Sequence, residues 1–162
     1  MKKKVIPVLL SSTFALGLFT FAPISQASSE EVVNPVVYDK EKKPFKSFSP
    51  QPLDPNSNGL AAAPVYTAHS GQYSLGGTWS TSDAYTSTSE TAKKAIDRIY
   101  AKTKHYVDGG SVGSRADEQY NASHAGAEVN KGAWYVGDDE VYGEHVFQHS
   151  GYQTWRTETY AS

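Results

Sequence analysis

The apolar side chains available after Pro64 constrain the fold of this chain more than any other feature. This region of about a hundred residues contains one leucine, one phenylalanine and two isoleucines. Most of the remaining bulk comes from seven valines, three tryptophans and ten tyrosines, on a background rich in Thr, Ser and Gly. Valine and aromatic residues fit the pleated, half-buried surface of a sheet. The composition therefore predicts a β-rich globular domain over residues 64–162.

Several segments of this domain combine strand-forming residues with turn residues at their ends. Strands are expected at 65–69, 72–80, 106–112, 119–129, 133–136, 140–149 and 152–160. Gly137-Asp138-Asp139 and Ser150-Gly151 are expected to close two hairpins, because Gly and Asp are favoured in tight turns. Hairpins at such short intervals predict a small antiparallel β-sandwich or a strongly bent sheet.

One segment of the domain has a helical period instead. Its apolar residues recur at i, i+3, i+4 and i+7, as on one face of a helix: Ala92, Ala95, Ile96, Ile99, Tyr100 and Thr103. Ser87 and Glu90 have the spacing of a capping box, and Asp108-Gly109-Gly110 ends the pattern. The segment predicts one amphipathic helix at about 88–104 that covers part of the sheet.

The N-terminus has the pattern of a secretory signal peptide over residues 1–27. A basic start, Met1-Lys2-Lys3-Lys4, precedes an apolar run, and Ser25-Gln26-Ala27 places small residues where signal peptidase cuts. The alternative is a membrane anchor, because the apolar run is nearly long enough to span a bilayer. The small residues favour cleavage, so we expect a secreted, extracellular protein, with or without cell-wall association and with no membrane span left after cleavage. The chain has no cysteine, a pattern that suits secretion by Gram-positive bacteria.

Residues 28–63 are expected to be a proline-rich pro-segment or a flexible tether. Proline removes hydrogen-bond donors and blocks helix interiors, and few large apolar residues here could offset the loss of chain entropy. The prolines recur throughout the segment: Pro35, Pro44, Pro50, Pro52 and Pro55. The alternative is that Val32-Val33 and Val36-Val37-Tyr38 dock as a short strand.

The charge balance argues against nucleic acid as a partner. Without Lys2, Lys3 and Lys4, twelve basic residues face seventeen acidic ones, a net charge near −5. Basic residues nevertheless gather on the expected helix, which makes it the candidate contact for an anionic wall polymer: Lys93, Lys94, Arg98 and Lys102. The alternative is that these charges are solvated or pair with the domain's own acidic strands.

Tryptophan and tyrosine provide the other candidate binding surface. Trp79, Trp134 and Trp155 could stack on sugar rings, although a domain with so little leucine is expected to bury at least two of them. Ten tyrosines cannot all be buried in about a hundred residues. Some must therefore lie at the surface, where their rings and hydroxyls suit a cell-wall glycan.

Catalytic and metal-binding patterns are weak. Gly109-Gly110-Ser111-Val112-Gly113 matches Gly-x-Ser-x-Gly, but that motif requires a strand before the serine and a helix after it, the reverse of the order expected here. A small secreted serine hydrolase would use Ser111 with His124, His145 or His149. His145 and His149 would lie about 13 Å apart on a strand, too far to share one ion. We therefore expect no cofactor, no metal and no enzymatic activity.

Four short segments resemble the lactococcin 972 family of secreted bacteriocins. Gly76-Gly77-Thr78-Trp79 resembles the Gly-Gly-x-Trp start of that family, and residues 100–107 resemble its Tyr/Lys/His-rich element. Lys131-Gly132-Ala133-Trp134 and Tyr152-Gln153-Thr154-Trp155 resemble its later tryptophan-bearing elements. The resemblance covers about residues 75–160. It implies a cysteine-free antiparallel β-sandwich that is antimicrobial and binds a cell-wall precursor.

These observations favour a secreted, non-enzymatic protein that acts at bacterial cell envelopes. A bacteriocin-like toxin is the first expectation. The alternative is a glycan- or cell-wall-binding module that does not kill, and the serine hydrolase is a third. Growth inhibition by the secreted protein separates the first from the second.

Overall fold

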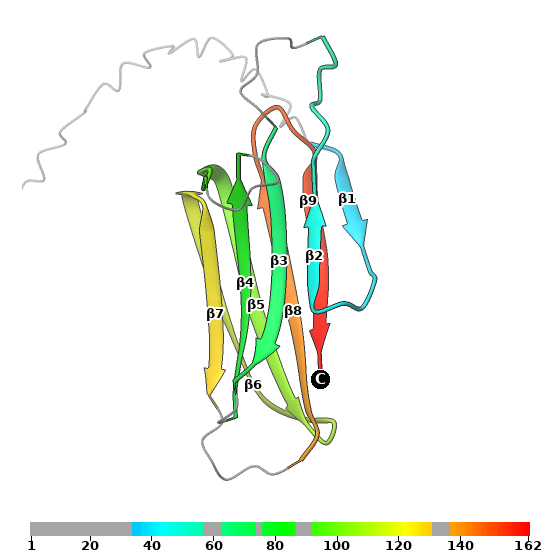
Figure 1. Cartoon of the computed structure of the whole chain (residues 1–162), viewed down its shortest axis with the longest axis vertical. Helices are drawn as coiled ribbons and strands as arrows, with labels where there is room; N and C mark the ends of the chain where they lie inside the picture. The colour runs from blue at the N-terminus through cyan, green and yellow to red at the C-terminus, as the bar shows by residue number, and fades with distance from the viewer. Residues whose placement is uncertain (1–33, 57–62, 74–75, 87–91, 131–136) are drawn as a thin grey trace, which may run out of the picture. The chain divides into compact units, whose positions relative to one another are not determined.

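The computed structural model of the chain describes residues 34–56, 63–73, 76–86, 92–130 and 137–162. These residues lie within one compact unit, Val32–Ser162. They form two β-sheets of five and four strands, and Figure 1 shows the four-stranded sheet in front of the other. The expectation of a mainly β, largely antiparallel protein is therefore confirmed.

The five-stranded sheet has the order β1-β9-β8-β5-β6. Its strands are β1 (Val36–Asp39), β9 (Thr154–Ala161), β8 (Asp139–Gln148), β5 (Ile96–Val107) and β6 (Gly110–Ala122). The neighbours β9, β8, β5 and β6 are antiparallel, whereas β1 joins the edge of β9 in the parallel sense. The hairpin of β8 and β9 is the one that the sequence predicts around Ser150-Gly151.

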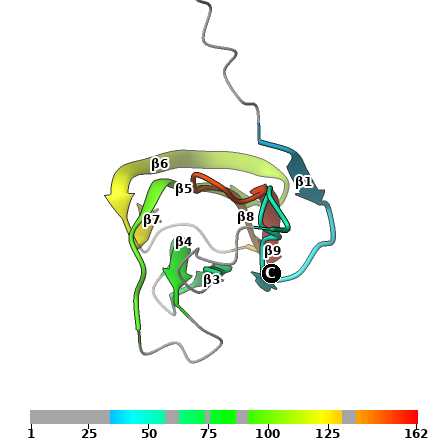
Figure 2. The ribbon, with the colours of Figure 1, turned by 90° about the horizontal axis from the view of Figure 1, so that it is seen from above.

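The four-stranded sheet is antiparallel throughout, with the order β2-β3-β4-β7. Its strands are β2 (Phe45–Phe48), β3 (Val65–Gln72), β4 (Gly77–Tyr85) and β7 (His124–Asn130). Figure 2 looks down on the strands and shows the two sheets as two layers, with β6 running toward β7 at one side. Each sheet therefore has an inner face toward the other sheet and an outer face.

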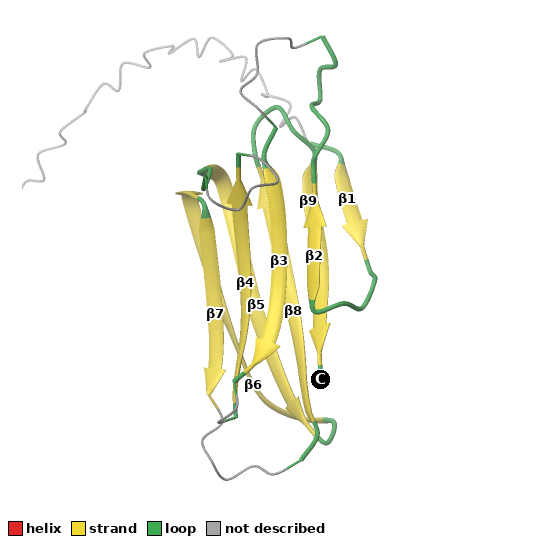
Figure 3. Ribbon diagram, in the orientation of Figure 1, coloured by secondary structure: helices red, strands yellow, loops and turns green. Residues whose placement is uncertain are grey.

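The predicted helix at 88–104 is wrong. Residues 87–91 lie outside the described residues, and residues 96–107 form β5, a strand paired on both sides. Figure 3 shows strands and loops and no helix among the described residues. The buried residues of β5 alternate with half-buried ones: Ile99, Ala101, Thr103 and His105 face inward. This period of two, rather than the helical period, is the one that the fold uses.

The turn after β5 also differs from the expectation. Residues 106–112 were expected to form one strand, but the chain reverses at Asp108-Gly109, and β6 returns along β5. Both turn residues have positive φ, 49° at Asp108 and 77° at Gly109. This is the conformation that Asp-Gly favours in two-residue hairpins, so the same residues that suggested the end of a helix instead close a hairpin. The expected strand at 119–129 is divided between β6 and β7.

Residues 34–56, within the segment expected to be a pro-segment or tether, contribute a strand to each sheet. β1 pairs with β9, and β2 pairs with β3. Proline residues flank the two strands rather than interrupt them, as edge strands allow. Lys46 on β2 is 3% exposed and lies 3.0 Å from the Asp39 carboxylate at the end of β1. This ion pair links the edges of the two sheets.

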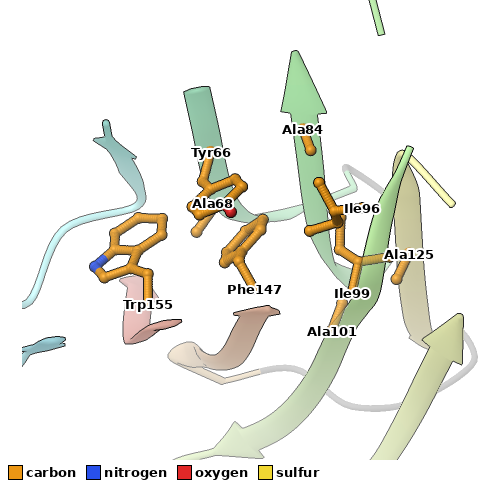
Figure 4. Close-up of a cluster of buried hydrophobic side chains, with 9 residues drawn as sticks. All are labelled: Tyr66, Ala68, Ala84, Ile96, Ile99, Ala101, Ala125, Phe147 and Trp155. Atoms are coloured by element: carbon orange, nitrogen blue, oxygen red, sulfur yellow. The ribbon is translucent and has the colours of Figure 1, made fainter. Parts of the chain in front are cut away.

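The apolar core lies between the sheets and depends on stacked rings rather than on leucine. Figure 4 shows Tyr66, Phe147 and Trp155 side by side at one end of the core cluster, with Ile96 and Ile99 at the other. The ring centroids of Tyr66 and Phe147 are 4.9 Å apart, and those of Phe147 and Trp155 are 5.1 Å apart. Trp155 is 1% exposed, so it is a core residue.

A second part of the interior is polar and centres on His145. Its Nδ1 lies 2.9 Å from the Ser82 hydroxyl on the opposite sheet, and its Nε2 lies 2.8 Å from the Thr159 hydroxyl on the next strand. Ser70 contacts both Thr159 and Ser80 through its hydroxyl. All of these side chains are buried, so the imidazole is enclosed by hydroxyl partners on both sides.

Candidate binding surfaces

The outer face of the four-stranded sheet carries an exposed group of rings. β4 alternates between buried Thr78, Ser80 and Ser82 and the outward residues between them, which include Trp79. We name the aromatic row the four residues Phe45, His69, Tyr73 and Trp79. Phe45 is 45% exposed and Tyr73 is 50% exposed, so the row is open to solvent.

The geometry of the row is set by cross-strand neighbours. Phe45 pairs with His69, and their rings meet edge-on with centroids 5.7 Å apart. The His69 ring stands at 82° to the Trp79 indole, with centroids 4.6 Å apart. The centroid of the Tyr73 ring lies 6.4 Å from that of the Trp79 indole. Three strands and the β3–β4 turn therefore bring four rings into one continuous surface.

Glycine holds Trp79 against the sheet. Gly71 is the cross-strand partner of Trp79, and a Cβ on Gly71 would lie 2.7 Å from the indole Cζ2. The indole therefore occupies the space above the glycine, a pairing that lets an aromatic side chain cover bare backbone. Any larger residue at position 71 would push the ring away from the sheet.

The segment Gly76-Gly77-Thr78-Trp79 builds one end of this surface. Gly76 has a φ of 80° and donates its N–H to the Tyr73 carbonyl, 3.1 Å away. A Cβ on Gly77 would lie 2.9 Å from the Tyr73 ring, so this glycine leaves room for the tyrosine. Thr78 is buried, and Trp79 faces outward. Each residue of the motif therefore has a structural role: Gly76 forms the turn, Gly77 leaves room for Tyr73, Thr78 is buried and Trp79 faces outward.

Polar groups border the rings. The Tyr73 hydroxyl donates to Glu128 Oε1 at 2.9 Å, a hydrogen bond that raises the pKa of the tyrosine. Glu128 is also the cross-strand partner of Trp79. Farther along the same face, His124 Nδ1 lies 2.9 Å from Asp83, and the Lys93 ammonium lies 3.7 Å from that carboxylate. The face therefore combines flat apolar rings with donors and acceptors of hydrogen bonds.

The outer face of the five-stranded sheet is different in character. It has two adjoining concavities, of about 380 and about 420 Å³, which share Glu144 and Glu158. Tyr106 and Tyr142 line the first, and Tyr38 lines the second. We name this pair of concavities the charged groove. Its residues come from β1, β5, β8 and β9, whose outward side chains meet on one face.

The four predicted basic residues do not form one patch. Lys93 lies beside Asp83 on the four-stranded sheet, whereas Arg98 and Lys102 lie on the five-stranded sheet. Arg98 Nε is 2.5 Å from Glu118 on β6, and the Lys102 ammonium is 3.5 Å from Glu144 on β8. The Lys94 ammonium instead lies 5.8 Å from the centre of the Tyr152 ring. Three of the four thus pair with the domain's own carboxylates, as the alternative interpretation expected.

The three tryptophans also have different positions. Trp79 is half-buried on the outer face and Trp155 is in the core, while Trp134 lies outside the described residues. Sequence reasoning did not include Phe45, His69 or Tyr73 among the binding residues. The period-two alternation of β2 and β3 could have placed Phe45 and His69 on one face, but their pairing depends on a register that the sequence does not show.

The residues considered for hydrolysis are far from a nucleophile–base arrangement. Ser111 is exposed on β6 and has no hydrogen bond to a histidine within the described ranges. His124 is bonded to Asp83, and His149 Nδ1 is 3.3 Å from Asp97. His145 does contact a serine, Ser82, but both are buried between the sheets, out of reach of a substrate.

No family model, curated protein or solved structure matches this chain. Within the described part, no helix has the length and apolar character needed to cross a membrane. The same residues contain no group of three or more potential metal ligands. The assignment of function therefore depends on the two outer faces.

Proposed function

We propose that this chain is a secreted, non-enzymatic protein that binds a glycan of the bacterial cell envelope through the aromatic row. The observation that carries the proposal is the position of Trp79, which is held above Gly71 on an exposed sheet face with rings on both sides. The carbon-bound hydrogens of a sugar ring make one of its faces apolar, and that face suits an exposed indole. Glu128 and the Tyr73 hydroxyl border the rings and would offer hydrogen-bond partners to the sugar hydroxyls.

Killing of bacteria is the second candidate, because the family resemblance includes this surface. The Gly-Gly-Thr-Trp segment that resembles secreted bacteriocins is the segment that builds the Tyr73–Trp79 end of the row. A toxin that recognises the envelope would need its recognition surface exposed, as these rings are. We therefore expect that any inhibition of growth depends on the same residues as binding.

Sedimentation with purified Gram-positive cell walls tests the proposal. The secreted protein should sediment with the walls, and Trp79→Ala should weaken binding roughly fivefold, because an aromatic contact contributes on the order of 1 kcal/mol. Trp79→Phe should retain part of the affinity. Tyr120→Ala is the matched control, since Tyr120 is 65% exposed but lies on β6 of the other sheet.

Two results would contradict the proposal: no sedimentation of the folded protein, or equal sedimentation of the Trp79→Ala and Tyr120→Ala proteins. Growth assays on a panel of Gram-positive bacteria then separate the two candidates. Inhibition that is lost in Trp79→Ala supports a toxin. Binding without inhibition supports a module that binds but does not kill.

A further inference from the structure

Strand β9 contributes two charged side chains of opposite sign to the charged groove, Arg156 and Glu158. Arg156 and Glu158 are exposed and two residues apart on β9, so they project from the same face of the sheet. Within the described residues, neither has an ion pair or a side-chain hydrogen bond. Several of the neighbouring charges are paired: Arg98 with Glu118, and Lys104 with Glu144. The hydrogen bond to Glu144 raises the pKa of Lys104, and Glu158 adds a smaller electrostatic contribution.

The two charges of β9 differ in their surroundings. Arg156 is beside Tyr38, its cross-strand partner, and lines only the second concavity, with Lys40 and Arg98 but also with Asp39. Glu158 and Glu144 line both concavities, and the first also contains Glu140 and Lys104. The first concavity is therefore net acidic, and the basic side chains are concentrated near Arg156 in the second.

Tyrosine rings accompany both charges. Tyr38 and Tyr100 line the concavity at the Arg156 end. Tyr106 and Tyr142 line the concavity at the acidic end, where their rings meet edge-on with centroids 5.6 Å apart. Rings next to carboxylates are a favourable setting for an ammonium group, because the ring face attracts cations.

We propose that the charged groove binds a short, extended zwitterionic peptide. Arg156 would pair with a carboxylate of the peptide, and Glu158 with an ammonium group. Alternate residues of a strand lie about 7 Å apart, and alternate residues of an extended peptide have the same spacing. A peptide with an acidic and a basic residue at positions i and i+2 therefore matches Arg156 and Glu158 in both charge and spacing. The site is on the sheet opposite the aromatic row, so it does not depend on glycan binding.

Fluorescence anisotropy with a labelled, end-blocked peptide Gly-Glu-Gly-Lys-Gly tests this site at low salt. The peptide should bind, and Arg156→Gln and Glu158→Gln should each weaken it at least tenfold, because a charged hydrogen bond is lost in each variant. A peptide in which Gln replaces either the Glu or the Lys should bind the unaltered protein weakly. Its affinity should be as low as that of the full peptide for the Arg156→Gln or Glu158→Gln protein.

Matched controls keep the test specific. Arg115→Gln removes an exposed arginine of β6 and should leave peptide binding unchanged, as should Trp79→Ala on the other sheet. The proposal is overturned if the zwitterionic peptide does not bind at millimolar concentration, if either groove variant binds as well as the unaltered protein, or if singly charged peptides bind equally well. Failure of wall sedimentation alone bears on the aromatic row and not on this groove.

Discussion

His145 has hydrogen bonds that define its protonation state. The Ser82 hydroxyl donates to the Tyr100 carbonyl at 2.7 Å, so it must accept a hydrogen bond from His145 Nδ1. Nε2 then accepts from Thr159, whose oxygen accepts from Ser70. This arrangement satisfies a neutral imidazole that carries its proton on Nδ1. Burial, together with the nearby charges of Lys46 and His69, lowers the pKa of His145 to about 3.

Stability should therefore fall as the solution is acidified from about pH 6.5 toward pH 3. The imidazole has its ordinary pKa of about 6.5 in the unfolded chain and a pKa of about 3 in the folded one, so protons favour unfolding within this window. Between pH 6.5 and 4.5, the free energy of unfolding should decrease by roughly 2–3 kcal/mol. Urea unfolding at a series of pH values measures the decrease.

The variant His145→Asn tests whether His145 causes the decrease in unfolding free energy at low pH. It removes the titrating ring, so its unfolding free energy should be nearly flat from pH 6.5 to 4.5, even if the variant is less stable overall. His124→Gln is the control, because His124 is an exposed histidine on β7. A slope that persists in His145→Asn would refute the assignment.

Gly143 makes room for this polar cluster. A Cβ at position 143 would overlap the hydroxyl oxygens of Ser70 and Thr159. Gly143→Ala should therefore lower the unfolding free energy by about 1–3 kcal/mol, as other overpacked interiors do. Gly113→Ala is the matched control, because a Cβ there would lie 3.4 Å from Val129, an ordinary contact. Equal stability of the two variants in urea would show that the cluster moves aside at little cost.

At the scale of single elements, β5 shows why one prediction failed. Ile96, Ile99 and Thr103 are all buried and have helical spacing, but the strand also buries Ala101 and His105, which the helical pattern does not include. Half of the buried residues from Ile99 to His105 are polar, so hydrophobicity alone does not reveal the period of two. The inner face becomes favourable only because partners from other strands satisfy it, for example the Ala127 carbonyl, which accepts from Thr103 at 2.6 Å. Such partners are not visible in the local sequence.

β1 and β2 show the same limit in a segment whose composition resembles a linker. The sequence leaves a strand at 36–38 open as an alternative and gives no sign of β2, yet Val37 packs on the core beside Trp155, and the Phe48 ring stacks on that indole with centroids 5.3 Å apart. The strands of the domain with clear alternation, β8 and β9, are the ones that the sequence predicted well.

The ion pair between these two edge strands gives an element-scale prediction. Lys46 is almost fully buried, so Asp39→Asn would leave its ammonium without a full counter-charge and should cost a few kcal/mol, roughly 2–4, in unfolding free energy. Adding Lys46→Met should recover much of the loss, since an apolar side chain fits the buried position. A double-mutant cycle in urea measures the coupling. Additive effects of the two substitutions would show that Asp39 and Lys46 do not stabilise each other across the two sheets.

The ion pair with Lys46 also affects the pKa of the Asp39 carboxylate. Burial acts to raise the pKa of Asp39, but the N–H of Glu41 and the Lys46 ammonium together hold the pKa below its usual value. Asp39 therefore stabilises the fold while it is ionised, and this contribution is lost below its ordinary pKa, at lower pH than the effect of His145. The two transitions can be told apart by their positions on the pH axis.

At the scale of the whole molecule, the sandwich presents two outer faces with different chemistry. The four-stranded sheet carries rings held above glycine, and the five-stranded sheet carries a groove with separated charges. Composition predicted that some of the tyrosines would reach the surface, but not which face would hold them. Trp79 and Trp155 have similar local sequences, each beside Thr, and only the fold places one outside and the other in the core.

Isotope-edited NMR of the ¹⁵N-labelled protein, titrated with soluble glycan strands from Gram-positive cell walls, tests the central claim most directly. We expect amide shifts concentrated on the four-stranded sheet around the aromatic row, at Phe45, His69, Gly71, Trp79 and Glu128. The amides of β9 should remain unshifted. Shifts confined to the five-stranded sheet, or no shifts at saturating glycan, would contradict glycan binding by the aromatic row.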